Sequence, residues 1–167
     1  MVKVGILMGS ISDEETVRPC AAVLETLGIP YRMTVSSAHR TPQRTEHIVD
    51  ELEADGCRVF ICAAGMAAHL AGAVAARTIR PVIGIPITAS SIGGMDALLS
   101  TVMMPPGFPV ATVALDKAGS RNAAWLAAQI LALEDEDVAE RLKAAREEFV
   151  REVEKAAARL EDKAEQA

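Results

Sequence analysis

Five short apolar runs alternate with helical patterns along most of the chain, and this alternation restricts the chain to few folds. The runs are rich in Val and Ile, and Gly, Ser or Pro follows most of them. They cover residues 2–8, 31–35, 58–63, 81–85 and 110–114. Between them, apolar residues recur three or four positions apart, which is typical of amphipathic helices. Strands that alternate with helices through short connections predict a parallel sheet with helices on both faces.

Residues that begin or end helices and strands set the expected boundaries. Pro42 suits the first turn of the second helix, and Pro86 closes the fourth strand. Ser12 and Glu15 have the spacing of a capping box at the first helix, and a helix of small residues is expected over residues 67–77. We predict an α/β fold: a three-layer α/β/α sandwich with a five-stranded parallel sheet in the flavodoxin-like order 2-1-3-4-5.

Composition excludes several kinds of partner. Half of the 167 residues are hydrophobic and 24% are charged, so a packed core is expected. The net charge is −6 and aromatic residues make up 3%. Both argue against a nucleic-acid partner, because nucleic acids are polyanions and single strands are bound by aromatic stacking. No apolar run reaches the ~20 residues that span a bilayer, so no membrane partner is expected.

The cysteines indicate the cellular compartment. Cys20, Cys57 and Cys62 are odd in number, lie in apolar runs and form no C-x-x-C pair. This pattern is typical of reduced, buried thiols, with a catalytic thiol as the alternative. Because a strand begins within two residues of the N-terminus, no signal peptide is expected. We therefore predict a cytoplasmic protein.

The last 34 residues differ from the rest. Residues 1–133 carry a net charge of −1, whereas residues 134–167 carry −5. Apolar residues recur three or four apart in this charged segment: Val138, Leu142, Ala145, Phe149, Val153, Ala156 and Leu160. We predict an α/β domain over residues 1–133 and a long amphipathic helix over residues 134–167 that packs on a neighbouring subunit. The alternative is a helix folded back on its own domain.

Polar and small residues gather where the first three predicted strands end. In an open parallel sheet, ligands bind beyond the carboxyl ends of the strands, near the switch in strand order. The predicted order makes these three strands neighbours, so their loops share one edge. The candidate residues are Ser10, Ser12 and Asp13 in the first loop, Ser37, His39 and Arg40 in the second, and Ala64, Gly65, His69 and Leu70 in the third.

The second loop carries the most specific chemistry. Arg40 offers a rigid fork of donors for phosphate, and the helix that follows adds unpaired N–H groups at its start. His39 can transfer a proton near neutral pH, and Asp13 can accept hydrogen bonds from sugar hydroxyls. These side chains, with the serines of the first two loops, predict a site for a phosphorylated, hydroxyl-bearing small metabolite with His39 as acid and base.

Structural interpretations of the same residues remain open. Ser10, Ser12 and Asp13 would serve only as helix caps. His69 would be a buried imidazole, and His47 a solvated residue on a helix surface. The three histidines lack metal-ligand spacing and no acidic cluster joins them, so no metal is expected.

Eight motifs in order make the chain similar to a known family. They are M-G-S-x-S-D (8–13), S-A-H-R-T-P (37–42), A-A-H-L (67–70), P-V-I-G-I-P (81–86), G-x-D-A-L-L-S (94–100), M-P-x-G-x-P-V-A-T (104–112), A-G-x-x-N-A (118–123) and L-A-A-Q-I-L-A (126–132). Together they resemble the 5-(carboxyamino)imidazole ribonucleotide mutases of purine biosynthesis, within the AIR carboxylase family. The S-A-H-R-T-P form resembles the bacterial mutase class.

The resemblance implies an isomerase that moves a carboxylate from the exocyclic nitrogen of an aminoimidazole ribonucleotide to a ring carbon. The product would be 4-carboxy-5-aminoimidazole ribonucleotide. The resemblance also implies a catalytic domain over residues 1–133, a homo-octamer whose C-terminal helices reach neighbouring subunits, and no metal or organic cofactor.

Residue by residue, the resemblance makes His39 the acid and base. Ser10, Ser12 and Asp13 would bind the phosphoribosyl part, and Ser37 with Arg40 would hold the phosphate. The third loop would form the wall of a small, dry pocket that retains carbon dioxide between the two steps. This wall would consist of Ala64, Gly65 and the segment from Ala67 to Leu70, with His69 nearby.

The chain departs from the family pattern in this third loop, where Met66 replaces a glycine and Ala71 a proline. These departures motivate one alternative, a carboxylase that uses free carbon dioxide or a paralogue of the same fold with shifted specificity. A flavodoxin-like flavin module and a catalytically idle assembly subunit are the others.

Overall fold

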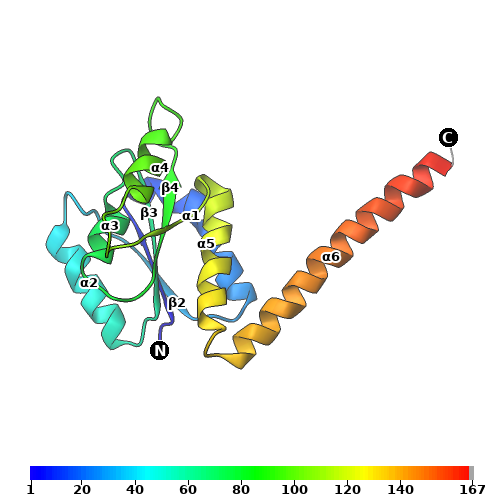
Figure 1. The fold of residues 1–167 in the computed structure, drawn as a ribbon, viewed down its shortest axis with the longest axis horizontal. Helices are drawn as coiled ribbons and strands as arrows, with labels where there is room; N and C mark the ends of the chain where they lie inside the picture. Colours follow the sequence, from blue (N-terminus) through cyan, green and yellow to red (C-terminus); the bar gives the residue numbers. More distant parts are fainter. Residues whose placement is uncertain (166–167) are drawn as a thin grey trace.

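The computed structural model describes residues 1–165, which form a parallel sheet flanked by helices and a long helix that projects from it (Figure 1). The strand order β2-β1-β3-β4-β5 confirms the predicted flavodoxin-like arrangement. The strands are β1 (Val4–Met8), β2 (Tyr31–Val35), β3 (Val59–Gly65), β4 (Val82–Ile87) and β5 (Ala111–Thr112). The helices are the 3-10 helix η1 (Ile11–Asp13), α1 (Glu14–Thr26), α2 (Pro42–Ala54), α3 (Leu70–Ala75), α4 (Met95–Val102), α5 (Asp116–Leu131) and α6 (Glu136–Glu165).

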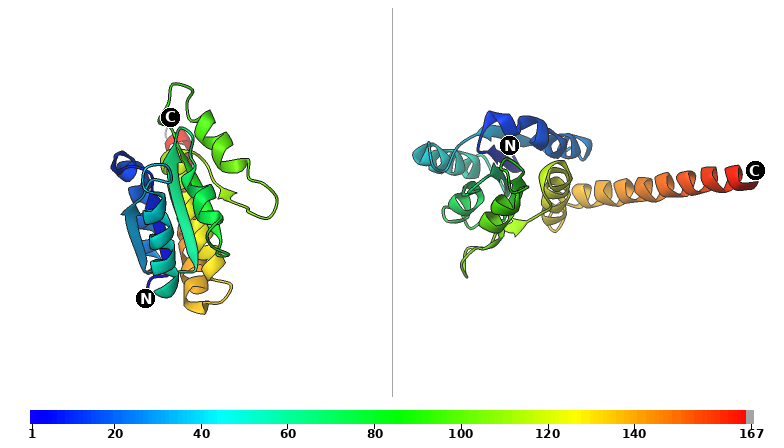
Figure 2. Two further views of the ribbon diagram at one scale, coloured as in Figure 1. Left: turned by 90° about the vertical axis from the view of Figure 1, so that its left-hand side faces the viewer. Right: turned by 90° about the horizontal axis from the view of Figure 1, so that it is seen from above.

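Two apolar clusters, one on each face of the sheet, form the core. Ile6 and Met8 of β1 belong to the cluster that contains buried residues of α1 and α5. Leu7, between them, belongs to the cluster with α2 and α3. Successive side chains of a strand point to opposite faces, so a strand covered on both faces is apolar throughout. The helical layers on the two sides of the sheet are visible in Figure 2.

β4 does not end at Pro86 as expected but continues to Ile87. The carbonyl of Gly84 accepts a hydrogen bond from the N–H of Val113 (3.1 Å), so the backbone groups of Gly84 face the β5 side. Pro86, two residues further on, faces the same side, and β5 pairs only with Ile83 and Gly84. The missing N–H of Pro86 therefore removes no bond between strands, which is why the proline is tolerated there.

α3 is shorter than the helix predicted over residues 67–77 and spans only Leu70–Ala75. Met66 and Ala68 have φ angles of 54° and 20°, which a right-handed helix does not allow. The N–H of Ala68 donates to the carbonyl of Gly65 (3.1 Å), so this segment is a turn at the end of β3. Small residues favoured the helix prediction, whereas the backbone has to turn here to cross the edge of the sheet.

The predicted capping box is not formed. The N-cap of α1 is Asp13, whose side chain makes no capping hydrogen bond. Ser10 caps η1 instead, because its Oγ accepts from the N–H of Ser12 (3.3 Å). The inserted 3-10 turn moves Ser12 away from the capping position that Glu15 would have completed.

The edge strand β5 and helix α5 also differ from their predicted bounds. β5 has two residues, Ala111–Thr112, where residues 110–114 were expected. The small residues of the segment 118–133 predict a helix there, whereas α5 begins two residues earlier, at Asp116, and ends at Leu131. β5 pairs with β4 alone, so it lacks the second neighbour that would lengthen it.

The first part of α6 packs on its own domain. Val138 and Leu142 are buried in the cluster shared with α1 and α5. Further along, the ring of Phe149 meets that of Trp125 in α5 edge to face, with centroids 5.4 Å apart. α6 therefore leaves the domain at a fixed angle, and its remainder extends away from the sheet (Figure 1).

The distal part of α6 is uncovered in the single chain. Val150 is 56% exposed, and Val153 and Leu160 are each 69% exposed. The helix is thus not folded back along its length on its own domain. The predicted segment 134–167 includes residues 166–167, which lie outside the described residues. None of the helices in the described part of the chain is long and apolar enough to cross a membrane.

Candidate active site

A cavity of about 470 Å³ lies at the carboxyl ends of β1, β2 and β3. All ten residues predicted for the site line it: Ser10, Ser12, Asp13, Ser37, His39, Arg40, Ala64, Gly65, His69 and Leu70. The cavity is completed by Gly9, Ala38, Met66, Ala67, Ala68 and Ala89. Ala89 belongs to the loop after β4, which was not among the loops predicted to form the site. Because β4 adjoins β3, the predicted strand order was the signal that could have found it.

Hydrogen bonds within the loop after β2 hold His39 and Arg40 in place. The hydroxyl of Thr41 accepts from the N–H of Ser37 (3.0 Å) and donates to its carbonyl (3.1 Å). Ser37 Oγ in turn accepts from the N–H of Arg40 (3.3 Å). α2 begins directly afterwards at Pro42, as predicted. The loop is therefore a short, tied turn that presents both functional side chains at the start of a helix.

Arg40 joins the first two loops and leaves its charge available to a ligand. Its Nη2 donates to the carbonyl of Gly9 (3.2 Å), and its Nε lies 3.5 Å from Ser37 Oγ. In the described part of the chain, Arg40 makes no ion pair with a carboxylate. A guanidinium fixed in this way at a helix N-terminus is well placed to bind phosphate.

His39 and His69 meet at the mouth of the cavity. Nε2 of His39 lies 3.3 Å from Nδ1 of His69, and the rings pack edge to face with centroids 5.1 Å apart. Their hydrogen bond needs one proton between the facing nitrogens, which either ring can supply according to its tautomer. His69 is exposed, so the alternative of a buried imidazole is wrong.

Asp13 is a poorly solvated carboxylate beside the two serines of the first loop. It is 8% exposed, and its Oδ1 accepts from the hydroxyl of Ser12 (3.3 Å). Burial raises the pKa of Asp13, and hydrogen bonds from Ser12 and from the backbone of Ser10 oppose that rise. An ionised carboxylate with little water around it gains from hydroxyl donors of a ligand.

We expect Asp13→Asn to stabilise the free protein. A carboxyl whose folded-state pKa is raised contributes stability that is fully present below its unfolded pKa and is lost as the pH rises through the folded-state pKa. At pH 7 the charged form therefore costs stability, which the amide does not. The melting temperature of the variant should be above that of the wild type at pH 7, by about 2–4 °C for each kcal/mol gained.

The difference should shrink as the pH is lowered through the raised pKa of Asp13, because the carboxyl then becomes protonated and uncharged. Asp162→Asn, at an exposed carboxyl of α6, is the control and should leave the melting temperature unchanged. A melting temperature of Asp13→Asn at or below the wild-type value at pH 7 would show that burial of the charged Asp13 carboxylate does not destabilise the free protein.

The cysteines take no part in this site. Burial raises the pKa of Cys20 to about 12 and that of Cys57 to about 11, and it also raises the pKa of Cys62. The three thiols are therefore protonated at neutral pH, and none of them lines the cavity. Because the thiolate is the nucleophilic form, the alternative of a catalytic thiol at this site is wrong.

The titratable side chains that the structure describes outside this cavity do not gather as metal ligands. Over residues 1–165, no group of three or more His, Cys, Asp or Glu is arranged to hold a metal ion. His47 lies on α2 with its side chain 74% exposed and its Nε2 3.2 Å from Glu51. His47 is therefore a solvated residue on the helix surface, as predicted.

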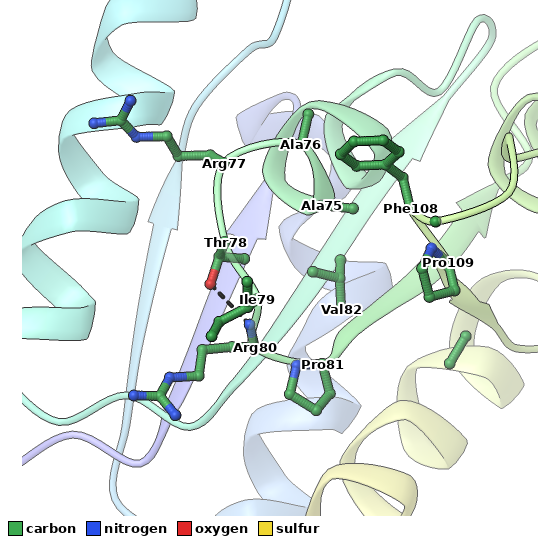
Figure 3. Close-up of a pocket in the computed structure, with 12 residues that line it drawn as sticks. Ala75, Ala76, Arg77, Thr78, Ile79, Arg80, Pro81, Val82, Phe108 and Pro109 are labelled. Carbon is green, nitrogen blue, oxygen red and sulfur yellow. Dashed lines mark hydrogen bonds between the residues drawn. The ribbon is translucent and has the colours of Figure 1, made fainter.

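A second and larger cavity, of about 580 Å³, lies at the opposite edge of the sheet, where β4 and β5 begin (Figure 3). Figure 3 shows Val82 and Pro81 at its floor and Phe108 at one side. The guanidinium of Arg77 points away and is paired with Asp50 (2.6 Å). This cavity is mostly apolar, and its lining contains no imidazole or carboxylate that could transfer a proton.

The fold and the cavity define a class of protein. The chain is a doubly wound α/β protein with a candidate ligand site at the carboxyl edge of the sheet, where a guanidinium suited to phosphate and an imidazole pair suited to proton transfer line one cavity. It belongs to the AIR carboxylase family, which matches residues 3–152. This confirms the resemblance found in the motifs.

Proteins of established name cover most of the chain. The N5-carboxyaminoimidazole ribonucleotide mutase of Bacillus subtilis is 49% identical over 144 residues, which are 86% of this chain and 89% of that protein. That of Escherichia coli K12 is 46% identical over 140 residues, 84% and 83% of the two chains. The crystal structure of Treponema denticola PurE superposes with a TM-score of 0.87 at 32% identity, over 96% of this chain and 99% of that one.

Proposed function

We propose that this protein is an N5-carboxyaminoimidazole ribonucleotide mutase, an isomerase of purine biosynthesis. The observation that carries the proposal is the meeting of Asp13, Arg40 and the His39–His69 pair around one cavity. Family membership and relatives that bear this name support it. The product is 4-carboxy-5-aminoimidazole ribonucleotide.

The polar half of the cavity binds the ribonucleotide. The phosphate is held by Arg40 and the hydroxyl of Ser37, with N–H groups at the start of α2 as further donors. The carboxylate of Asp13 accepts from the ribose hydroxyls, and Ser10 and Ser12 complete this contact. The base then extends toward the imidazole pair and the wall of small residues from Ala64 to Leu70.

His39 serves both proton transfers. In the first step the bond between the exocyclic nitrogen and the carboxylate carbon breaks, carbon dioxide forms, and the nitrogen takes a proton from the His39 imidazolium. In the second step the ring carbon forms a bond to carbon dioxide, and its proton returns to His39. The two transfers run in opposite directions, so the neutral imidazole left by the first step becomes the imidazolium again in the second. His69 holds the ring of His39 in position through their hydrogen bond.

No metal or organic cofactor is part of this proposal, because a single imidazole accounts for both proton transfers. A flavin-binding module is less well supported. Of the described residues that line the cavity, none is Phe, Tyr or Trp, so an isoalloxazine ring would lack an aromatic partner.

Two assays on the purified protein test the proposal. In the first, the carbamate substrate is supplied and the carboxylated product is measured; in the second, aminoimidazole ribonucleotide and bicarbonate are supplied. We expect product at low substrate concentration in the first assay and little in the second. Activity in the second assay alone would show a carboxylase that uses free carbon dioxide. Absence of activity in both assays would support the alternative of a catalytically idle assembly subunit.

We further propose that residues 1–133 form the catalytic domain and that residues 134–167 assemble the protein into a homo-octamer in the cytoplasm. The uncovered distal stripe of α6 supports assembly, since Val153 and Leu160 are large apolar side chains that are mostly exposed in the single chain. The protonated, buried thiols are consistent with a reducing compartment. The acidic tail gives no reason to expect a nucleic-acid partner.

The assembly is tested by Val153→Asp. A charge buried in a contact between helices is costly, so we expect light scattering to give a mass well below that of eight subunits. Ala158→Asp adds the same charge on the polar face of α6 and should leave the mass unchanged. An unchanged mass in Val153→Asp, or a monomeric wild type, would contradict this role of α6.

A further inference from the structure

Met66 is the one long apolar side chain at the mouth of the cavity. The wall near the end of β3 otherwise carries glycine and alanine, apart from His69 and Leu70, and Leu70 is only 2% exposed. Met66 lines the same cavity and is 61% exposed. Its side chain therefore reaches from the cavity into solvent, and a thioether chain with three rotatable bonds adapts readily to the shape of a ligand.

The backbone at Met66 is held in a conformation that disfavours any residue with a side chain. Its φ angle is 54°, in the left-handed region, which is unfavourable for a residue that carries a Cβ atom. Gly65 allows the turn to lie close to the loop after β4, because a Cβ at this position would lie 2.6 Å from the Cβ of Ala89. The hydrogen bond from the N–H of Ala68 to the carbonyl of Gly65 closes the turn. Strain of this kind persists where the surrounding structure enforces it, often at functional sites.

The proposed reaction requires an apolar cover over the cavity, a role that the Met66 side chain is suited to fill. Carbon dioxide is free between the two steps, is uncharged, and offers little to the polar groups of the cavity. His39 and Arg40 are both exposed, so the polar side of the cavity does not seal it. An apolar cover is what would hinder the escape of carbon dioxide and the entry of water.

We propose that Met66 covers the imidazole half of the bound nucleotide and retains carbon dioxide between its release from nitrogen and its capture by the ring carbon. This inference rests on the proposed mutase function. Met66 is then a residue that determines how completely the carboxylate is transferred, while the proton transfers themselves belong to His39.

The experiment uses carbamate substrate labelled with ¹³C in its carboxylate, in buffer that contains unlabelled bicarbonate and carbon dioxide. The product is analysed by mass spectrometry for the label retained, and the decarboxylated nucleotide is measured beside it. A reaction without enzyme gives the spontaneous loss of carbon dioxide. The variants are Met66→Gly, which removes the cover, and Met66→Leu, which keeps an apolar side chain of similar size.

We expect wild type and Met66→Leu to retain most of the label, and Met66→Gly to lose several times more label and to release more decarboxylated nucleotide per product formed. Met66→Gly should also melt at a higher temperature than the wild type, because glycine relieves the left-handed strain. That readout shows that the variant folds.

Each outcome bears on one hypothesis. Equal retention of label in wild type and Met66→Gly, with product formed by both, would overturn the role of Met66 and leave the mutase function intact; the cover would then be another part of the assembly. Complete exchange of the label in the wild type would also overturn it. Absence of product from the wild type would instead overturn the mutase function.

Discussion

Replacing His39 with asparagine should lower turnover by about 10²- to 10⁴-fold, the contribution typical of a positioned acid or base. Asparagine cannot exchange a proton near neutral pH, but it is polar and smaller than histidine and fits the exposed position of His39. We therefore expect the fold and the affinity for the nucleotide product to be largely kept. Turnover is measured with the carbamate substrate, and affinity by isothermal titration calorimetry.

His47→Asn is the matched control, because His47 lies on α2 away from the cavity and pairs only with Glu51 among the described carboxylates. Its turnover should equal that of the wild type. If His39→Asn retained a rate within about tenfold of the wild type, the role of His39 as acid and base would be wrong. A loss of nucleotide binding in His39→Asn would point instead to a binding role.

Replacing Arg40 with alanine should weaken nucleotide binding by about 30-fold, since a charge-assisted contact to phosphate contributes ~2 kcal/mol. The effect should appear mainly in KM, because the phosphate is remote from the atoms that react and is held equally before and during the reaction. Lysine at this position should restore part of the affinity, since it keeps the charge but not the two-pronged geometry.

Arg44, which lies four residues after Arg40 in the first turn of α2, provides a matched control. Its Nε donates to the carbonyl of Val35 (3.2 Å), and it does not line the cavity. Arg44→Ala should therefore leave KM unchanged. An unchanged KM in Arg40→Ala would refute the phosphate site, whereas a fall in kcat alone would indicate that Arg40 acts on the reacting groups.

Local patterns predicted most of the fold because they report local physics. Strands buried on both faces need continuous apolar runs, and Pro42 marks the start of α2 at the predicted residue. The failures share one cause. Pro86 stays inside β4 because β5 ends before it, and the predicted helix over residues 67–77 is shortened because the chain turns at Met66. Both depend on neighbours distant in sequence.

The candidate site, too, was predicted where it depends on local sequence and missed where it depends on contacts between distant segments. Each loop was found from its residue types and from the rule that ligands bind where parallel strands end. The bond between His39 and His69, which are 30 positions apart, had no local signal, nor did the reach of Arg40 to the carbonyl of Gly9. Ala89 was missed because its loop carries no group that stands out chemically.

By itself, the sequence determined the alternation of strands and helices, the edge of the sheet where the candidate site lies, and the residue types gathered there. These depend on hydrophobic periodicity and on the chemistry of single side chains, which are read along the chain. Tertiary structure alone decided which two imidazoles are in contact, which carboxylate is buried, and which part of α6 is left uncovered. Those properties arise from contacts between segments far apart in sequence, and only folding brings the segments together.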